Sequence, residues 1–348
     1  MNPFLLTIVI ISLTTGTLIT ITSSHWILAW LGLEINTFAI LPMMIHMHSP
    51  RKIEVTVKYF IIQTIATMLI LFATIMNAWV TGEWEIKQTN LTLPLLLISL
   101  ALMLKMGLAP LHAWFTEAVQ SSDFLTGLIL STWQKFAPLT LLLQLTTKHS
   151  TITITIGLLS ILIGGLGGLN QTQTRKILSY SSIAHLGWMI LISQYIPLMA
   201  FTTFVIYTIM NFSMFFMLFL SQSTSIKILT TIWVKTPSFL FIMPLILLSL
   251  GGLPPLTGFL PKWMILSELL KQSLTPFATM AAMASLLSLY FYLRMAYMTA
   301  MTTSPNLVLT IVPWRITSLY PPVILAISSS LSLYILPLSP AIMIMTCL

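Results

Sequence analysis

Charged residues are scarce in this chain of 348 residues, where lysine, arginine, aspartate and glutamate together occupy 6% of the positions. A soluble domain carries charge on about 25% of its residues, because its surface faces water. Hydrophobic residues make up 57% of the chain, in long continuous runs. The scarcity of charge therefore excludes a soluble protein and predicts an all-α polytopic membrane protein.

Cysteine is almost absent as well. The single cysteine, Cys347, excludes an internal disulfide and any iron–sulfur or zinc site held by cysteines. The chain also lacks a phosphate-binding loop, a dinucleotide fingerprint and a hydrolase motif. Its net charge of +8 comes from cations scattered along the sequence, without the run or stripe that contacts nucleic acid. We therefore expect no bound cofactor, no metal and no nucleic-acid partner.

Apolar runs of bilayer length recur along the chain, and each crossing needs about 20 mainly apolar residues. We predict about 11 transmembrane helices, at residues 3–22, 25–46, 57–80, 91–118, 124–146, 151–169, 176–196, 198–221, 237–269, 275–300 and 318–340. Two shorter amphipathic stretches, 225–235 and 301–317, are expected to lie on the membrane surface.

Positive charge is distributed unequally between the two sides of this predicted topology. One side collects Arg51, Lys52, Lys58, Arg175, Lys176, Lys227, Lys235, Arg294 and Arg315. The other side collects Lys87, Lys148 and Lys271. The positive-inside rule therefore places Met1 on the matrix or cytoplasmic side and Leu348 on the opposite side.

The fourth predicted span carries helix-breaking residues at membrane depth. Gly107 and Pro110 follow closely after Lys105, and a proline removes one backbone donor while its ring clashes with the carbonyl four residues earlier. Broken helices occur within membranes where the freed backbone lines protein or a water-filled cavity. The sequence therefore predicts a break in the helix with water near Lys105.

The ninth predicted span is interrupted in the same way before Lys262. Its helix-breaking residues are Gly251, Gly252, Pro254 and Pro255. Interrupted helices at corresponding positions of two repeats indicate a transport path. We therefore predict one membrane domain over 1–348, with a first inverted five-helix repeat at 1–146 and a second at 151–300. A surface segment and one further helix follow at 301–348.

Three charged residues lie in the middle of predicted spans, namely Glu34, Lys105 and Lys135. A charge at the centre of the bilayer costs about 2.5–3.5 kcal/mol even on a lenient insertion scale, so function is the first interpretation. A buried lysine releases its proton readily and can serve as a proton acceptor. We predict that Glu34 and Lys105 approach within ion-pair reach, directly or through one water, although a structural ion pair between helices remains an alternative for Glu34.

Lys262, His112 and His185 complete the set of candidate proton carriers. Lys262 follows the second break, where extension of its side chain to the membrane interface is an alternative. His112 follows Lys105 by seven residues, which places both on one face if the helix resumes its register. His185 suits a proton relay because histidine titrates near neutrality, but a packing role also fits. Other charged residues are expected to face water or the interface: Glu117 and Asp123, which flank a short polar loop, and Glu268 and Lys271.

Three ordered motifs carry a resemblance to a known family. They are GLAPLHAW at 107–114, RKILSYSSIAHLGWM at 175–189 and LSLGGLPPLTGFLPKW at 248–263, with a mid-span Lys135 between the first two. This set resembles the antiporter-like membrane subunits of respiratory complex I and of multisubunit cation/proton antiporters. The similarity spans nearly the whole chain. It departs from many relatives after His112, where AVQSSDF replaces an alanine-proline motif.

The resemblance implies a proton-translocating subunit in the mitochondrial inner membrane, without redox chemistry of its own. It places the family's proton-transfer roles on Glu34, Lys105, Lys135 and Lys262, with His112 and His185 on the hydrophilic axis between them. The complex as a whole would use NADH, FMN, iron–sulfur clusters and ubiquinone. The implied partners are other membrane-arm subunits, including neighbouring antiporter-like subunits, and phospholipids such as cardiolipin.

Two other classes remain open at this point. A cation/proton antiporter subunit would share the broken helices but would hold a cation with carboxylates or carbonyls at the breaks. A structural or assembly subunit would join its neighbours without conducting protons, and it would have no internal chain of water.

Overall fold

The computed structural model describes residues 3–46, 49–89, 91–145, 150–230, 239–301 and 322–341. Within these residues every named element is a helix, and extended backbone pairs only at two isolated bridges. In the described part of the chain, six helices are long and apolar enough to cross a membrane, and three apolar helices are shorter. The stretch 302–321, which contains most of the predicted surface segment 301–317, lies outside the described residues, as do residues 231–235 of the other predicted surface stretch, 225–235.

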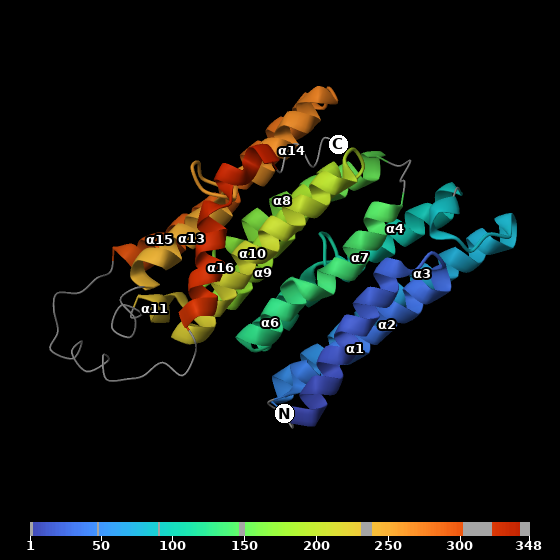
Figure 1. The fold of residues 1–348 in the computed structure, drawn as a ribbon, viewed down its shortest axis with the longest axis horizontal. Helices are drawn as coiled ribbons and strands as arrows, with labels where there is room; N and C mark the ends of the chain where they lie inside the picture. Colours follow the sequence, from blue (N-terminus) through green and yellow to red (C-terminus); the bar gives the residue numbers. More distant parts are fainter. Residues whose placement is uncertain are drawn as a thin grey trace. The chain divides into compact units, whose positions relative to one another are not determined.

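The chain forms two compact units, residues 1–156 and 157–348. Unit 1 contains α1 (Pro3–Thr22), α2 (Trp26–Ile45), α3 (Pro50–Thr81), η1 (Ile86–Gln88), α4 (Thr92–Met106), α5 (Ala113–Ser121), α6 (Phe124–Ser131) and α7 (Trp133–Gln144). Helix α2 packs between α1 and α3, while α4 packs on both α3 and α7 (Figure 1).

Helix α3 begins earlier than the predicted span because its first turn is capped. The Ser49 hydroxyl accepts a hydrogen bond from the Lys52 backbone N–H at 3.4 Å, and Pro50 occupies the first helical position. Proline suits this position because its fixed φ fits the helix and its missing N–H would be unpaired anyway. Gly82 ends the helix in the left-handed conformation at φ 76°, which glycine adopts at little cost.

A pair of backbone hydrogen bonds ties the start of α2 to the segment after α3. The Trp26 N–H donates to the Trp84 carbonyl at 3.1 Å, and the Ile86 N–H donates to the Ser24 carbonyl at 3.0 Å. We call this pair the unit 1 clasp. It holds the two loops at the same end of unit 1.

Unit 2 begins within α8 (Ser150–Gly168) and continues with α9 (Thr174–Ser193), α10 (Pro197–Ser221), α11 (Ile226–Leu229), α13 (Phe239–Gly251), α14 (Phe259–Lys271), α15 (Thr275–Ala300), α16 (Pro322–Tyr334) and η4 (Leu336–Leu338). Helix α10 packs against α9, α13 and α16, and α13 packs against α15.

The same type of clasp occurs in unit 2. The Thr174 N–H donates to the Thr224 carbonyl at 3.2 Å, and the Ile226 N–H donates to the Thr172 carbonyl at 3.0 Å. Gln222, at φ 51°, ends α10 in the left-handed conformation. Each unit therefore joins its second helix to the end of its third helix through two backbone hydrogen bonds.

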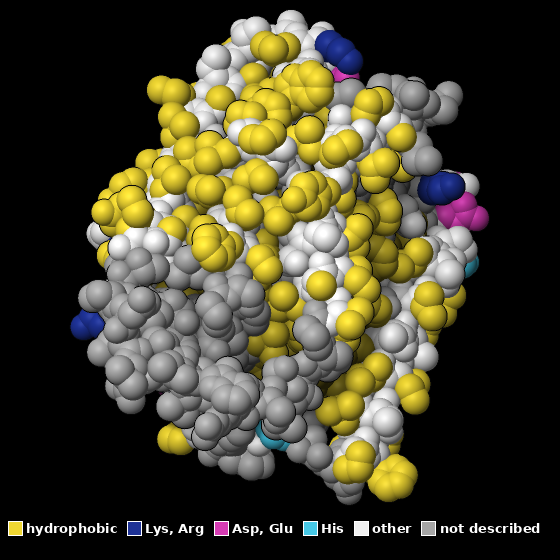
Figure 2. Space-filling model, turned by 60° about the vertical axis from the view of Figure 1, so that its left-hand side comes forward, with side chains coloured by type: hydrophobic (Ala, Val, Ile, Leu, Met, Phe, Trp, Pro, Cys, Tyr) yellow, Lys and Arg dark blue, Asp and Glu magenta, His cyan; other side chains and the backbone are white. Residues whose placement is uncertain are grey.

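The outward-facing side chains are mostly apolar. Phe4, Trp79 and Met283 are 77%, 89% and 69% exposed, and Figure 2 shows a surface dominated by apolar side chains with a few isolated charges. A surface of this kind would aggregate in water but is stable against hydrocarbon. The exterior therefore agrees with a multi-pass membrane protein.

Candidate functional site

Glu34 lies half-buried on α2. Its carboxylate accepts hydrogen bonds from the Thr37 hydroxyl at 3.2 Å and from the Thr67 hydroxyl on α3. Thr67 is fully buried. These two donors satisfy a carboxylate that would otherwise be costly among apolar helices.

Lys105 lies next to the last residue of α4 and is 6% exposed. Its Nζ has no hydrogen-bond partner among the residues that the structure describes. Glu34 is therefore not in direct contact with Lys105, although its charge acts on the lysine electrostatically. The direct form of the predicted pairing is therefore absent, because Thr37 and Thr67 hold the carboxylate on the α2–α3 side. Pairing through one water stays a prediction.

The chain leaves helical geometry directly after Lys105. Gly107 adopts φ 75°, and the Leu108 N–H donates to the Met103 carbonyl at 3.2 Å, which closes the end of α4. Helix resumes at Ala113 in α5. The Gln63 amide of α3 donates to the freed Lys105 carbonyl at 3.5 Å. Gly107 and Pro110 thus lie in a non-helical connection beside Lys105.

Lys135 is 1% exposed, which makes it the most deeply buried cation among the described residues of unit 1. Its Nζ lies 4.2 Å from the centroid of the Phe115 ring, a cation–π contact supplied by α5. Its own span is divided at Thr132, where α6 ends and α7 begins. No local sequence signal marks this interruption, because neither glycine nor proline adjoins Thr132 and Pro138 lies six residues later.

Two small cavities within unit 1 are lined in part by Lys105, and one of them also by Lys135. One is lined by residues including Tyr59, Gln63, Lys105, Gln134 and Lys135, and the other by residues including Asn36, Thr37, Gln63, Lys105 and Gln134. Each measures about 10 Å³, which is room for about one water molecule. The cavities share Lys105 and two glutamine amides, so polar groups extend from the Glu34 side of unit 1 to Lys135.

Unit 2 brings His185 and Lys262 together. They are 9% and 8% exposed and line a cavity of about 10 Å³ with Thr203 and Tyr207. Lys262 Nζ donates to the Gly251 carbonyl at 2.7 Å. That carbonyl belongs to the last turn of α13, where carbonyls lack helical donors and attract a cation.

The break beside Lys262 runs from Gly252 to Gly258, between α13 and α14. Gly251 is the last residue of α13, Gly252 adopts φ 77°, and Pro254 and Pro255 lie in the non-helical connection. Lys105 precedes its break whereas Lys262 follows its own. The two lysines therefore do not occupy equivalent positions.

The structure does not support the helical register that linked His112 to Lys105. Residues 107–112 are not helical, so a seven-residue spacing does not place the two side chains on one face. His112 precedes α5, and its Nδ1 lies 3.0 Å from the Pro110 carbonyl oxygen. Its predicted proton-transfer role remains a prediction.

Glu268 differs from its expected interfacial position because it is 6% exposed. Its carboxylate pairs with Lys271, whose side chain is 64% exposed. The lysine three residues later on α14 thus reaches outward while neutralising the buried carboxylate. A buried carboxylate three residues from a lysine could have been expected from helical spacing.

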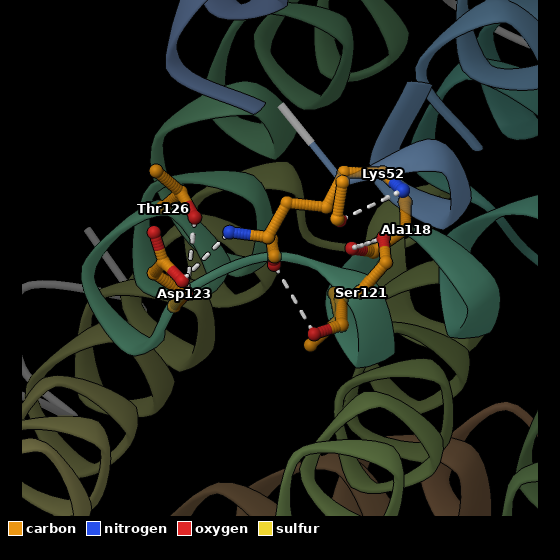
Figure 3. Close-up of polar contacts among 8 residues, drawn as sticks. Lys52, Ala118, Ser121, Asp123 and Thr126 are labelled. Carbon is orange, nitrogen blue, oxygen red and sulfur yellow. Dashed lines mark hydrogen bonds and ion pairs between the residues drawn. The ribbon is translucent and has the colours of Figure 1, made fainter. Parts of the chain in front are cut away.

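Ion pairs join the start of α3 to the turn between α5 and α6. Lys52 Nζ contacts Asp123 Oδ1 at 3.0 Å, and the Thr126 hydroxyl donates to the Asp123 carbonyl at 3.0 Å (Figure 3). Lys58 Nζ contacts Glu54 at 2.8 Å and Glu117 at 3.3 Å. The stretch 118–123, predicted as a polar loop, is helical as far as Ser121, where α5 ends.

Replacing Lys52 by methionine should lower the free energy of unfolding by about 0.2–1 kcal/mol, because partly exposed ion pairs are screened by solvent. Thermal denaturation of the purified protein would measure this change. The control is Lys227→Met, which changes an exposed lysine on α11. A loss several times larger than this range would show that the pair is more than a surface contact.

Solved structures of low sequence identity share this fold. A chain of respiratory complex I from Thermus thermophilus with bound aureothin is 23% identical, with a TM-score of 0.81, over 97% of this chain and 78% of that chain. A chain of the Mrp complex from Dietzia sp. DQ12-45-1b is 15% identical, with a TM-score of 0.82, over 97% of this chain and 75% of that chain. The fold is thus that of chains in membrane-bound respiratory and antiporter complexes.

Sequence comparison identifies the family. Residues 23–288 match the model of the transmembrane region of the NADH:quinone oxidoreductase/Mrp antiporter family, and residues 289–343 match that of the NADH dehydrogenase subunit 2 C-terminus. NADH-ubiquinone oxidoreductase chain 2 of Tetraodon nigroviridis is 53% identical over 99% of both chains. The chain belongs to the NADH:quinone oxidoreductase/Mrp antiporter family, and within it resembles chain 2.

Proposed function

We propose that this chain is the antiporter-like, proton-translocating chain 2 of a respiratory NADH:ubiquinone oxidoreductase. The observation that carries the proposal is that Lys105 and Lys135 line a shared small cavity among the apolar helices of unit 1, while the charge of Glu34 acts on Lys105 from α2. In this role the chain contributes proton movement to the enzyme complex, while NADH oxidation and quinone reduction occur in other subunits.

The chemistry follows from charge in a medium of low dielectric. Glu34 favours a protonated Lys105, because opposite charges stabilise each other strongly when water is scarce. A change that weakens this interaction would release the proton of Lys105 toward the shared cavities and Lys135. A proton passing through one water molecule at each cavity requires no movement of the helices.

We further propose that the two units derive from one repeated architecture. Both have a clasp, a left-handed residue at the end of the third helix, and a broken helix ending at a left-handed glycine. The two repeats would span 1–146 and 151–300, followed by a further helix within 301–348, with about 11 crossings in all. Five crossings per repeat would invert the second repeat relative to the first.

The expected setting follows from the relatives. We propose a multi-pass location in the mitochondrial inner membrane, with Met1 on the matrix side and Leu348 in the intermembrane space. Partners would be neighbouring antiporter-like subunits and other membrane-arm subunits, with phospholipids such as cardiolipin against the apolar exterior. The complex would supply NADH, FMN, iron–sulfur clusters and ubiquinone, and this chain would hold none of them.

Replacing Glu34 by glutamine tests the proposed function. Glutamine keeps the shape of the side chain and one oxygen that can accept from either Thr37 or Thr67, but it removes the charge that acts on Lys105. Because one neighbouring charge shifts a protonation equilibrium by about tenfold or more, we expect proton translocation per NADH oxidised to fall in sealed vesicles containing the assembled complex.

The matched control is Glu54→Gln, which removes a carboxylate that is 63% exposed and paired with Lys58. It should leave proton translocation unchanged. Undiminished translocation with Glu34→Gln in an assembled complex would contradict the proposal and favour a structural subunit. Translocation that depends on sodium instead of protons would favour a cation antiporter.

A further inference from the structure

The repeated contacts define which positions of unit 2 correspond to the charged positions of unit 1. Trp26 and Thr174 are the corresponding N–H donors of the two clasps. Glu34 lies eight residues after Trp26, and Ser182 lies eight residues after Thr174, so these two residues also correspond. A Cβ on Gly16 would meet Asn36 and the Gly32 carbonyl, and a Cβ on Gly164 would meet Ala184 and the Tyr180 carbonyl. Each residue of the glycine contact in unit 1 is separated from its counterpart in unit 2 by the same number of positions as the clasp residues are. The clasps and the glycine contacts therefore give the same alignment of the two units.

The third helices align in the same manner. Gly82 and Gln222 end α3 and α10 in the left-handed conformation, three residues before the clasp residues Glu85 and Ser225. Counting back from these ends, Thr67 corresponds to Tyr207. The side chain of Thr67 donates to Glu34, and that of Tyr207 faces Ser182. The contact between the second and third helices is therefore retained, with hydroxyl groups in place of the carboxylate.

Unit 2 has also lost the lysine of the first break. The left-handed glycines Gly107 and Gly252 align the two breaks, which makes Leu250 the counterpart of Lys105. His185 and Lys262 thus lie at positions that are not counterparts of Glu34 and Lys105. A proton path in unit 2 would therefore use groups other than those of unit 1.

Tyr207 is placed to be that group. It is 1% exposed, and its hydroxyl accepts a hydrogen bond from the Asn211 amide at 3.1 Å. Its ring centroid lies 5.3 Å from that of His185. Tyr207 also lines the cavity of about 10 Å³ that reaches Lys262, which has room for about one water molecule.

We propose that the Tyr207 hydroxyl relays protons between His185 and Lys262, an inference that rests on the proposed proton-translocating function. In each transfer the phenolic oxygen accepts a proton from the donor side as it releases its own proton to the acceptor side, directly or through one water. The O–H bond that breaks is replaced by the one that forms, so the hydroxyl is neutral before and after. Asn211 fixes the orientation of the hydroxyl.

The test is Tyr207→Phe in the assembled complex, measured in sealed vesicles as protons translocated per NADH oxidised. The change removes one oxygen and keeps the ring against His185. We expect translocation to fall by about two- to tenfold, the effect of one hydrogen-bonded link. The control is Phe204→Leu. The Phe204 ring centroid lies 6.4 Å from that of Tyr207, so this change alters the packing of Tyr207 without removing a hydroxyl. It should leave translocation unchanged.

Separate outcomes distinguish the relay from the proposed function. Reduced translocation with both Glu34→Gln and Tyr207→Phe, but not with Phe204→Leu, would support the relay. A reduction with Glu34→Gln alone would overturn the relay and retain the function. Equal losses with Tyr207→Phe and Phe204→Leu would assign Tyr207 to packing and also overturn the relay. If Tyr207→Phe lowers assembly, Asn211→Leu provides a second variant that keeps the hydroxyl and disturbs its orientation, and normal translocation there would count against the relay.

Discussion

Replacement of Lys135 by methionine is expected to leave the complex assembled and to abolish most of the proton translocation that depends on this chain. Methionine fills a similar apolar volume, so the packing of α7 against α4 is kept. The change loses a cation–π contact worth about 0.5–2 kcal/mol. It also removes the cost of a buried charge, which offsets that loss. What disappears is the second of the two lysines that line the small cavities of unit 1 in the described residues.

The measurement is the ratio of protons translocated to NADH oxidised, together with the amount of assembled complex. Lys87→Met is the matched control, because Lys87 is exposed on η1. It should change neither quantity. Normal translocation with Lys135→Met in an assembled complex would contradict a conducting role and favour the structural alternative. Loss of assembly would instead show that removing the buried charge does not offset the loss of the cation–π contact.

A second large effect is expected from Gly258→Ala. A Cβ at Gly258 would lie 1.7 Å from the Ser249 carbonyl oxygen, so the backbones of the two half-helices would have to separate. Overpacking of a core costs about 1–3 kcal/mol and occasionally more. A clash with backbone belongs at the upper end, since no side chain can rotate away. We expect little assembled complex and rapid thermal inactivation.

Gly82→Ala is the control for this substitution. Gly82 has φ 76° but nothing within 4 Å of an added Cβ, so alanine there meets only the backbone penalty of about 1–2 kcal/mol. The complex should assemble and inactivate at a slightly lower temperature. Equal stability of the Gly258→Ala and wild-type complexes would show that the close approach of α13 and α14 is unimportant.

Helix positions could be predicted where an apolar run and its ends coincide. The first predicted span, 3–22, has the same bounds as α1. The third was predicted to begin at 57, seven residues after the start of α3, because its charged first turns suggested a loop. Ser49 and Pro50 did provide a capping signal there. The charged residues therefore did not mark the start of the helix, whereas the capping residues did.

The candidate site could be predicted only where one residue type carries the signal. Mid-span charge identified Glu34, Lys105 and Lys135, because charge is costly in hydrocarbon wherever the chain folds. The ring of Phe115 over Lys135 and the Gly251 carbonyl beside Lys262 are tertiary contacts between separate helices. No local pattern encodes such contacts. The spacing that linked His112 to Lys105 failed because it assumed a helix across Gly107 and Pro110.

The clasps also have a consequence for the order of events during synthesis. The unit 1 clasp closes between Ser24 and Ile86, well before the ribosome reaches the second clasp at Thr172 to Ile226. Units that contain their own contacts generally fold as they emerge, the amino-terminal one first. The first three helices can therefore dock while later ones are still being made. Insertion into the bilayer would then proceed as two successive events, and an error in the second would leave the first intact.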